Sequence, residues 1–423
     1  MLNIFKFGGA SVRDAEGVKN LAQIVRSHSN NLVVVVSAMG KTTNALEGIL
    51  SQFISSDQSI WKKFAELKDY HLKIAVELFG EICPEKVEDI EQLFVELKGL
   101  LQHSPTGNYN FSYDQVVSYG ELISTKIIST YLNAVGVSNT WVDIRRILRT
   151  DCNYREGNVD YQVSQELSKQ QFTFNGNSIF ITQGFIGGTA DGYTTTLGRE
   201  GSDYTAALLA NLLDAESVTI WKDVDGVLNA DPRIFNETVK LDEVSFKEAI
   251  ELAYCGAQII HPKTIKPLQN KQISLYVKSF AKPTLGGTRV YQTDKRIAYP
   301  PILIVKPNQV LISLTPRDFS FVIEDCLSKI FGILYNHRVK ANLVQSSAIS
   351  FSICVDDEEH FLPNAIAELN ETFAVRYNRG LELLTIRHYS AEVLEKLIVG
   401  KSVYLQQKTR STIRVMYEKG SDN

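Results

Sequence analysis

The sequence is poor in cysteine, in clustered charge and in long hydrophobic runs. Its five cysteines lie far apart without a C-x-x-C pair, and none of the seven histidines has the spacing of a zinc ligand to a cysteine, so no structural zinc site is predicted. A net charge of -4 with dispersed Lys and Arg gives no footprint for nucleic acid. The longest apolar strand, Leu32–Val36, is far too short to span a membrane, and Lys6 interrupts the N-terminal apolar run before a signal-peptide core forms. These absences predict a cytoplasmic protein with no nucleic-acid or membrane partner.

What is present is an alternation of short apolar segments and helical segments from Asn3 to about Gln292, which is typical of an α/β sheet domain. Leu2–Phe7 and Leu32–Ser37 are predicted strands, joined by a predicted helix over Ala15–Ser27. Further buried strands are predicted at Ser178–Thr182, Ser217–Trp221 and Ser274–Val277. Because ligands of such sheets bind at the carboxyl ends of the strands, the segments that follow these strands are the candidate site.

The alternation of strands and helices ends near Pro300-Pro301, and this double proline is typical of a linker. Beyond it a strand, a helix, two strands and a helix are predicted in βαββαβ order, followed by a shorter echo from Leu381. A chain of 423 residues favours two or three domains. We therefore expect a three-layer α/β sheet domain over residues 1–295, an α+β domain over 302–378 and a truncated second α+β copy over 379–423.

The segment Lys6-Phe7-Gly8-Gly9-Ala10-Ser11 follows a predicted strand and precedes a predicted helix. Its backbone N–H groups would point to a place where an anion can bind. Gly8 and Gly9 have no Cβ to keep a polyphosphate away from the main chain, and Lys6 adds a positive charge. The segment favours a phosphate site, while an ordinary glycine turn beside a solvated lysine is the alternative.

The loop Ser37–Thr43 also follows a predicted strand, and its Gly-Lys-Thr sequence invites a Walker A interpretation. That motif needs a glycine at the position where Val35 stands, so the interpretation is disfavoured. A second polar loop that offers Ser37 and Thr43 to a substrate fits the sheet better.

The richest polar stretch combines Gln183–Thr189 with Leu197–Thr205. A helix is predicted to begin near its end, with Asp203 in the first turn, where a carboxylate is favourable. Asp203 could cap this helix only, but two glycine runs beside an arginine favour a functional cluster. Trp221–Val227, followed by Asp231-Pro232-Arg233, forms turns that could hold ribose and phosphate.

Together these motifs resemble the aspartate kinase branch of the amino-acid kinase family, over essentially the whole chain. Several motifs in one order are more specific than any single one. The segments that carry the resemblance are Lys6–Val12 (family pattern KFGGTSV), Gly120-Glu121-Leu122, Gly198–Asp203, Asp223–Gly226 with Asp231-Pro232-Arg233, and Gly256-Ala257 leading to His261-Pro262.

The resemblance implies phosphorylation of the L-aspartate side-chain carboxylate by ATP with Mg²⁺, the first step toward lysine, threonine and methionine, with no metal site of protein side chains. It implies that Lys6 and Asp203 are catalytic, and that Arg199 and Glu121 bind the charged ends of aspartate. The other implied contacts are Thr43 and Ser202 for the substrate, and Gly8, Gly9, Ser11, Lys222, Asp223, Leu228 and Arg233 for ATP. A carboxylate is ionised at pH 7, so this chemistry needs no general base.

The chain departs from the family pattern at four positions. Ala10 replaces a threonine, Glu200 a glycine and Leu228 a frequent tyrosine. Gln258 stands where a nucleotide-contacting lysine is common. We expect these changes to alter nucleotide affinity and to leave the chemistry intact.

The region from Ile302 resembles ACT domains, which implies a homodimer formed through this region and the binding of an end-product amino acid. The resemblance lies in Phe331–Leu334 and in Asn342–Ser347, which makes Asn342, Ser346 and Ser347 the candidate regulatory residues. Lysine-sensitive relatives usually carry an acidic residue where Ala348 stands. The sequence therefore leaves open whether lysine, threonine or another effector acts.

Two alternatives remain from the sequence. The chain could be another member of the family, such as a glutamate kinase. It could also be an inactive ACT-type amino-acid sensor, although such a protein would be expected to have lost Lys6 or Asp203, and both are present.

Overall fold

The computed structural model describes residues 1–29, 31–57, 59–105, 107–176, 178–257, 260–318 and 320–418. These residues form two compact units. The first contains the described residues of 1–227, 240–253 and 258–297, and the second contains those of 228–239, 254–257 and 298–423. No helix among the described residues has both the length and the apolar character needed to cross a membrane.

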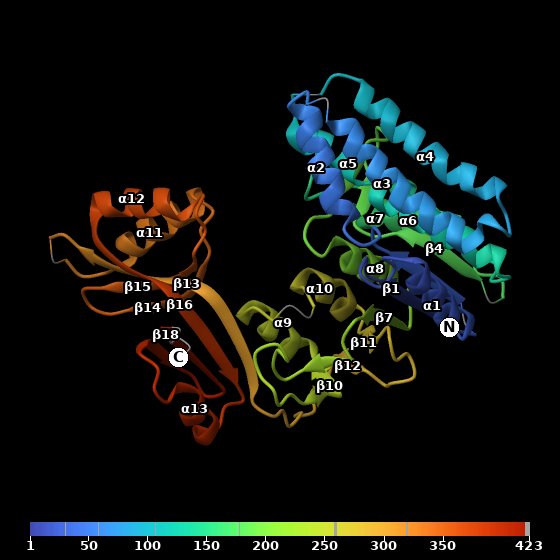
Figure 1. Ribbon diagram of the computed structural model, residues 1–423. Helices are drawn as coiled ribbons and strands as arrows, with labels where there is room; N and C mark the ends of the chain where they lie inside the picture. The colour runs from blue at the N-terminus through green and yellow to red at the C-terminus, as the bar shows by residue number, and fades with distance from the viewer. Residues whose placement is uncertain are drawn as a thin grey trace. The chain divides into compact units, whose positions relative to one another are not determined.

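The first unit is built on an eight-stranded sheet (Figure 1). Neighbouring strands are parallel except for the antiparallel pair β11 and β12. The central strands are buried on both faces, as their continuous apolar and β-branched sequences require. In spatial order the strands are β10 (Glu243–Ser245), β12 (Thr288–Tyr291), β11 (Ser274–Ser279), β7 (Ser217–Lys222), β1 (Leu2–Phe7), β2 (Asn31–Val36), β4 (Ile179–Gln183) and β3 (Thr140–Val142).

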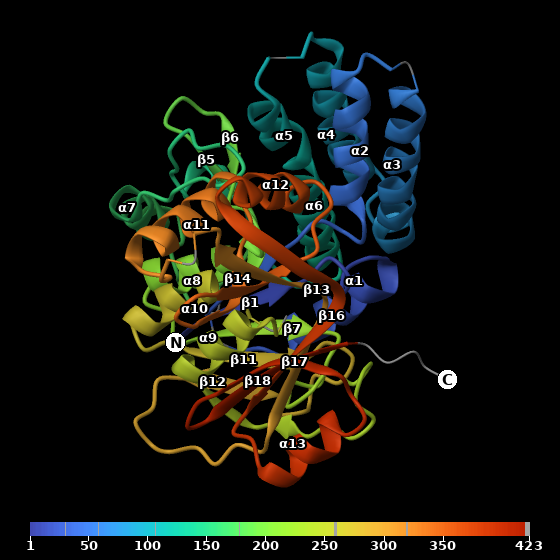
Figure 2. The same ribbon diagram turned by 90° about the vertical axis from the view of Figure 1, so that its left-hand side faces the viewer.

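A group of helices covers one face of this sheet, and Figure 2 shows α2 to α6 side by side. The helical segment between Ser51 and Leu101 belongs to this group. Its members are α1 (Ala15–Arg26), α2 (Thr42–Ile54), α3 (Ile60–Ala75), the π-helical turn Val76–Gly80, α4 (Glu85–Gln102), α5 (Tyr109–Val117) and α6 (Tyr119–Ala134). The other elements of the unit are the 3-10 turn Ile144–Arg146, α7 (Tyr161–Gln171), β5 (Ile186–Gly188), β6 (Thr194–Thr196), α8 (Gly201–Leu212), β8 (Val227–Leu228), β9 (Lys240–Leu241), α9 (Phe246–Cys255) and α10 (Pro262–Asn270), of which β8 and α9 extend into the second unit.

The alternation of side chains along β1 decides where its lysine points. Phe5 and Phe7 belong to the apolar core shared with the α1 to α6 helices. Lys6 lies between them, so its side chain projects from the opposite face. That face is covered by α8, which packs against β1, β2, β7 and α10.

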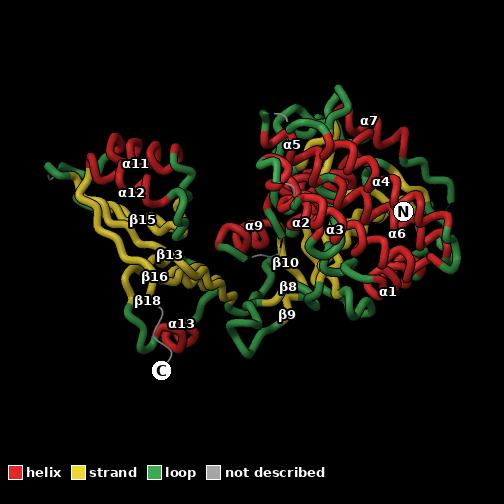
Figure 3. Tube along the Cα trace, turned by 45° about the horizontal axis from the view of Figure 1, so that its top comes forward, coloured by secondary structure: helices red, strands yellow, loops and turns green. Residues whose placement is uncertain are grey.

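The second unit is an antiparallel six-stranded sheet with α11 (Glu324–Asn336) and α12 (Leu362–Thr372) together on one face (Figure 3). A third helix, α13 (Ala391–Ile398), packs with the later strands. The strands, in spatial order, are β14 (Ala341–Ser346), β15 (Phe351–Asp356), β13 (Ile302–Pro316), β16 (Phe373–Arg387), β18 (Thr412–Glu418) and β17 (Val403–Lys408).

The strands β13 and β16 are 15 residues long each and run through both halves of this sheet. The first part of β13 (302–306) pairs with residues 383–387 of β16, beside β18. Its later part (309–316) pairs with residues 373–381, beside β15. The two repeated segments of the sequence therefore share their longest strands. The α/β sheet domain followed by an α+β region of ACT type confirms the expected fold class.

Candidate active site

Two lysines from adjacent strands converge on one buried aspartate. In the parallel pair of β1 and β7, Lys6 lies opposite Ile220 and Phe7 lies opposite Trp221. Lys222, the last residue of β7, is therefore close to the end of β1. Asp203 lies in the first turn of α8, which packs against both strands. Lys6 Nζ is 2.7 Å from Asp203 Oδ1, and Lys222 Nζ is 3.8 Å from Oδ2. The strand ends and the start of α8 thus form one cationic cluster around a single carboxylate.

The charge state of Asp203 follows from the balance of two effects. Burial by itself would raise the pKa of its carboxyl group, since the side chain is only 1% exposed. The ammonium groups of Lys6 and Lys222 outweigh burial and hold the pKa below its usual range. Asp203 is therefore ionised at neutral pH and holds the side chains of both lysines beside the glycine loop.

One main-chain hydrogen bond joins the glycine loop after β1 to the loop after β2, and another closes the glycine loop on itself. Gly40 N–H donates to Gly9 O at 2.9 Å, and Ser11 N–H donates to Gly8 O at 3.0 Å. A Cβ on Gly9 would lie 2.3 Å from Ala38 O, so only glycine fits there. At Gly8 the nearest atom to such a Cβ is Lys6 Nζ at 3.6 Å, so the lysine ammonium lies over the loop.

Glu121 on α6 is buried and only partly paired. Its Oε1 accepts from Ala38 N–H at 3.2 Å, while among the described residues Oε2 has no hydrogen-bond partner. Burial raises the pKa of this carboxyl group to about 8, against the opposing influence of Ala38 N–H and Lys6. A buried carboxyl oxygen without a partner is a ready acceptor for a ligand N–H group.

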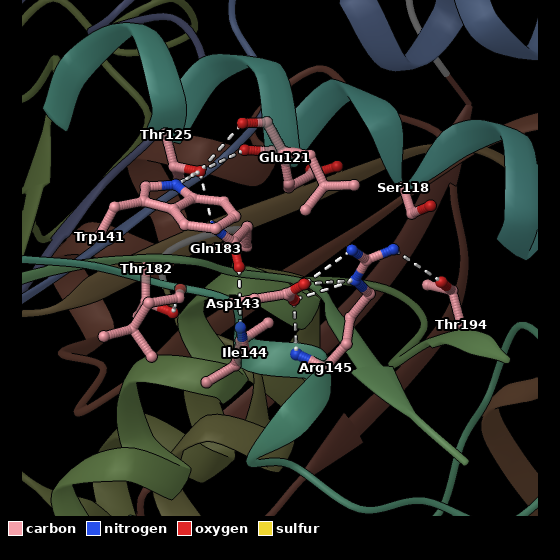
Figure 4. A network of polar contacts seen from close by, with 12 residues as sticks. Ser118, Glu121, Thr125, Trp141, Asp143, Ile144, Arg145, Thr182, Gln183 and Thr194 are labelled. Carbon is pink, nitrogen blue, oxygen red and sulfur yellow. Dashed lines mark hydrogen bonds and ion pairs between the residues drawn. The ribbon is translucent and has the colours of Figure 1, made fainter. Parts of the chain in front are cut away.

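A buried polar network anchors α6, and with it Glu121, to the sheet (Figure 4). Thr125 Oγ1 donates to Glu121 O at 2.8 Å and accepts from Gln183 Nε2 at 2.8 Å and Trp141 Nε1 at 3.0 Å. Gln183 Oε1 in turn accepts from Ile144 N–H at 2.9 Å. The bonds of Thr125 to Trp141 and Gln183 join α6 to β3 and β4, and Gln183 also joins β4 to the turn after β3. The position of Glu121 is therefore fixed before a ligand binds.

The described part of the first unit contains a cavity of about 410 Å³ at this place. It brings together seven residues expected from the sequence, namely Lys6, Ser37, Thr43, Glu121, Arg199, Ser202 and Asp203. It is also lined by Tyr113, Arg155, Phe185, Thr196, Gly198, Glu200 and Gly201. Tyr113, Arg155 and Thr196 were missed by sequence reasoning, because nothing in their local sequence marks them.

Three non-glycine residues of the cavity wall have a left-handed backbone. The φ angles are 72° at Arg155, 69° at Phe185 and 56° at Glu200. Such backbones are unfavourable for residues with a Cβ and cluster at functional sites. Glu200 is the residue that replaces the glycine of the family pattern, and it directly precedes the helix that carries Asp203.

The remaining residues expected to contact ATP lie outside the cavity lining. Gly8, Gly9 and Ser11 form the loop beside Lys6, and Asp223 is exposed after β7. Leu228 and Arg233 belong to the second unit, where Arg233 forms a two-pronged ion pair with Asp231, with Nη2 to Oδ2 at 2.7 Å. Gln258 lies outside the described residues.

The candidate regulatory residues of the second unit differ in their surroundings. Asn342 Nδ2 donates to Gln309 Oε1 at 2.9 Å, and Asn342 Oδ1 accepts from Lys306 Nζ at 2.9 Å. Ser346 and Ser347 are exposed. Asn342 is therefore a member of a polar cluster within the sheet, while the two serines face solvent.

Comparison with known proteins fits this geometry. The Amino acid kinase family profile matches residues 1–279. Lysine-sensitive aspartokinase 3 of Escherichia coli (strain K12) is 32% identical over 413 residues, which cover 95% of this chain and 90% of that protein. Aspartokinase 1, chloroplastic, of Arabidopsis thaliana is 29% identical, over 97% of this chain and 76% of that protein.

Two solved structures share the fold. The crystal structure of E. coli aspartokinase III in complex with aspartate and ADP has a TM-score of 0.82 at 29% identity and covers 99% of this chain and 96% of that one. The aspartate kinase of Clostridium acetobutylicum has a TM-score of 0.80 at 22% identity, over 98% and 96% of the two chains, and shows the fold alone. The profile match and the extent of the similarity to aspartokinase 3 place the chain, as a member, in the amino acid kinase family and in its aspartokinase branch.

Proposed function

We propose that this chain transfers the γ-phosphoryl group of ATP to the side-chain carboxylate of L-aspartate, giving 4-phospho-L-aspartate. The observation that carries the proposal is the content of one cavity. It joins the Lys6–Asp203 pair, suited to a phosphate, to the half-paired Glu121 and to Arg199. An ammonium group and a carboxylate on one small molecule would satisfy Glu121 and Arg199 together. The product would be the first intermediate toward lysine, threonine and methionine.

In this proposal the substrate carboxylate attacks in its ionised form and the protein supplies position and positive charge. Lys6 neutralises charge on the phosphoryl group in transfer, and Asp203 holds Lys6 in place. Glu121 accepts from the substrate ammonium, Arg199 pairs with a carboxylate, and Thr43 and Ser202 complete the acceptor site. Gly8, Gly9, Ser11, Lys222, Asp223, Leu228 and Arg233 are proposed to contact ATP.

Mg²⁺ is proposed as the cofactor that accompanies ATP. Among the described residues, no three acidic, histidine or cysteine side chains are grouped as a metal site. This suits Mg²⁺, which commonly binds through substrate phosphates, water and one or two carboxylates. The ion would supply additional neutralisation of phosphate charge, and Asp203 is the buried carboxylate at the phosphate end of the cavity.

The domain plan that goes with this function is also a proposal. Residues 1–295 would form the catalytic domain, with ACT-like domains over 302–378 and 379–423 that support a homodimer. Asn342, Ser346 and Ser347 would respond to an end-product amino acid. A cytoplasmic location completes the proposal.

The test is an assay of ADP release from Mg·ATP with L-aspartate, L-glutamate or no acceptor. We expect turnover with aspartate and little with glutamate, whose additional methylene would displace either its carboxylate from the phosphate or its ammonium from Glu121. Equal or greater turnover with glutamate would contradict the proposed substrate. A titration with lysine, threonine and methionine in the same assay identifies the effector.

A further inference from the structure

A loop that carries none of the family motifs places a second guanidinium group at the cavity. Arg155 lines the cavity together with Arg199. Its backbone is left-handed, with φ 72°, and its N–H donates to Asp114 Oδ2 at 2.9 Å. Asp114 on α5 is fully buried and also accepts from Thr196 N–H at 2.9 Å and Thr196 Oγ1 at 2.7 Å. One buried carboxylate therefore fixes two residues of the cavity wall.

The Arg155 side chain is supported by aromatic rings. Its guanidinium carbon lies 4.4 Å from the ring centroid of Tyr113 and 5.8 Å from that of Tyr109. Tyr113 is held in turn by its hydroxyl group, which donates to Glu47 Oε1 at 2.7 Å. An arginine that is stacked in this way is partly ordered before an anion arrives, so less entropy is lost on binding.

Among the described residues the guanidinium group of Arg155 forms no direct ion pair, although the Asp114 carboxylate bound to its main-chain N–H acts on its charge from a distance. Lys6 is matched by Asp203, and the proposed substrate ammonium would match Glu121. Within the part of the chain that the structure describes, no ion pair involves Arg155 or Arg199. An acidic amino acid brings two carboxylates. One must reach the phosphoryl group near Lys6, and the other needs a cation elsewhere in the cavity.

We propose that Arg155 is a substrate-specificity residue, which binds the α-carboxylate of the acceptor amino acid together with Arg199. The inference rests on the proposed function and adds a residue to its acceptor site. The surroundings of Arg155 favour the acceptor over the nucleotide. They include Tyr109, Tyr113, Asp114 and Gly198, none of which belongs to the glycine loop or the lysine pair at the phosphate end.

The experiment compares Arg155→Gly with the unchanged chain. Glycine accepts the left-handed backbone and keeps the N–H bond to Asp114, so the loop should retain its fold. We expect the KM for aspartate to rise by about 10- to 100-fold, as for loss of charged hydrogen bonds. The KM for ATP and kcat should stay within about threefold. Arg338→Gly is a matched control, because Arg338 also has a positive φ, 56°, but lies in the second unit.

A second acceptor separates α-carboxylate binding from a general effect on the site. L-Aspartate α-amide keeps the reacting carboxylate and the ammonium but lacks the negative charge on the α-carbon. The unchanged chain should prefer aspartate over the amide, and Arg155→Gly should lose most of that preference. An unchanged aspartate KM with unchanged preference would overturn the inference, as would a rise confined to the KM for ATP.

Different results would refute the proposed function and the proposed role of Arg155. If the unchanged chain turns over no aspartate, the proposed function falls and this inference falls with it. If the unchanged chain is active and Arg155→Gly behaves as the unchanged chain does, only the role of Arg155 is refuted. Calorimetric titration of aspartate into both proteins checks the same change in affinity without turnover.

Discussion

Lys6 Nζ and Asp203 Oδ1 lie 2.7 Å apart, with the lysine side chain only 10% exposed. Lys6 comes from strand β1, and Asp203 comes from the first turn of α8. Helix α8 covers the face of the sheet that the α1 to α6 helices leave open. The cation is thus in place before any phosphate arrives. Preorganised charge of this kind needs little rearrangement during the reaction, which is where much of its catalytic effect originates.

Lys6→Ala is expected to lower kcat by at least about 100-fold, since loss of a preorganised charge donor typically costs that much or more. Lys222 would still lie near Asp203, so the fold should persist. ADP release and circular dichroism measure the two effects. The control is Lys19→Ala, which removes an exposed lysine paired with Glu16 on α1. Near-normal turnover of Lys6→Ala would refute the assigned role.

Glu121→Gln should remove a pH dependence of stability. The folded pKa of Glu121, about 8, lies above its ordinary value, so the native state binds more protons than the unfolded state between about pH 4.5 and 8. The unchanged chain should therefore lose stability from this group as pH rises across that window, and Glu121→Gln should not. Urea unfolding at pH 5, 6, 7 and 8 gives the difference. Parallel curves for the two proteins would contradict the raised pKa.

His71 on α3 should make the stability of the protein depend on pH with the opposite sign, so that stability is lost as pH falls. Burial lowers its pKa to about 4, while Nδ1 lies 2.8 Å from Leu67 O and Nε2 lies 3.1 Å from Thr42 Oγ1. The unfolded state binds the proton more readily, so stability from this group is complete above about pH 6.5 and is lost as pH falls toward 4. His71→Leu should show a shallower acid loss over pH 6.5 to 4.5. An equally steep loss would contradict this assignment.

Substitutions at Glu200 test whether its left-handed backbone at the start of α8 is strained. Its left-handed backbone disfavours β-branched residues strongly, so Glu200→Val should cost about 1–2 kcal/mol of stability. Glu200→Gly should unfold at the same temperature as the unchanged chain or slightly higher. Thermal unfolding of both variants measures the difference. If the valine variant is as stable as the glycine variant, the result would contradict a left-handed backbone at position 200.

Gly9→Ala and Gly99→Ala form a contrasting pair. A Cβ at Gly9 would lie 2.3 Å from Ala38 O, whereas none of the described atoms within 4 Å would oppose one at Gly99 inside α4. Gly9→Ala should move the loop that faces the phosphate and reduce kcat by about 10-fold or more. Gly99→Ala should stabilise the protein by about 0.5–1 kcal/mol through its helix propensity, without a change in kcat. Equal kcat values in the two variants would contradict the close packing of Gly9.

Much of the first unit follows from local sequence alone. The predicted strand Leu2–Phe7 is β1 residue for residue, and the helix predicted over Ala15–Ser27 is α1 with one residue fewer at its end. Both have strong periodicity and clear ends, including an Asp14 side chain that accepts from Gly17 N–H at 2.8 Å. Lys6 and Asp203 were found because a motif surrounds each of them.

Other features depend on contacts between distant segments and could not be predicted locally. Arg155 reaches the cavity only because Asp114, from another helix, holds its backbone. The buried, half-paired carboxyl group of Glu121 depends on the loop after β2, whose Ala38 N–H bonds only one of its two oxygens. The pairing of both parts of β13 with the one long strand β16 was also beyond local prediction, because it joins segments that lie far apart in the sequence.

Because β13 and β16 run through both halves of the second unit, this unit cannot be divided into two separately expressed proteins without breaking a strand pair. A boundary after position 378 looks natural from the repeated sequence, but residues 302–306 pair with 383–387. A protein expressed only to position 378 would leave the first part of β13 without its partner strand, with unpaired main-chain groups and exposed apolar side chains such as Ile302 and Ile304. The C-terminal region is therefore best handled in the laboratory as one piece and never as two separable modules.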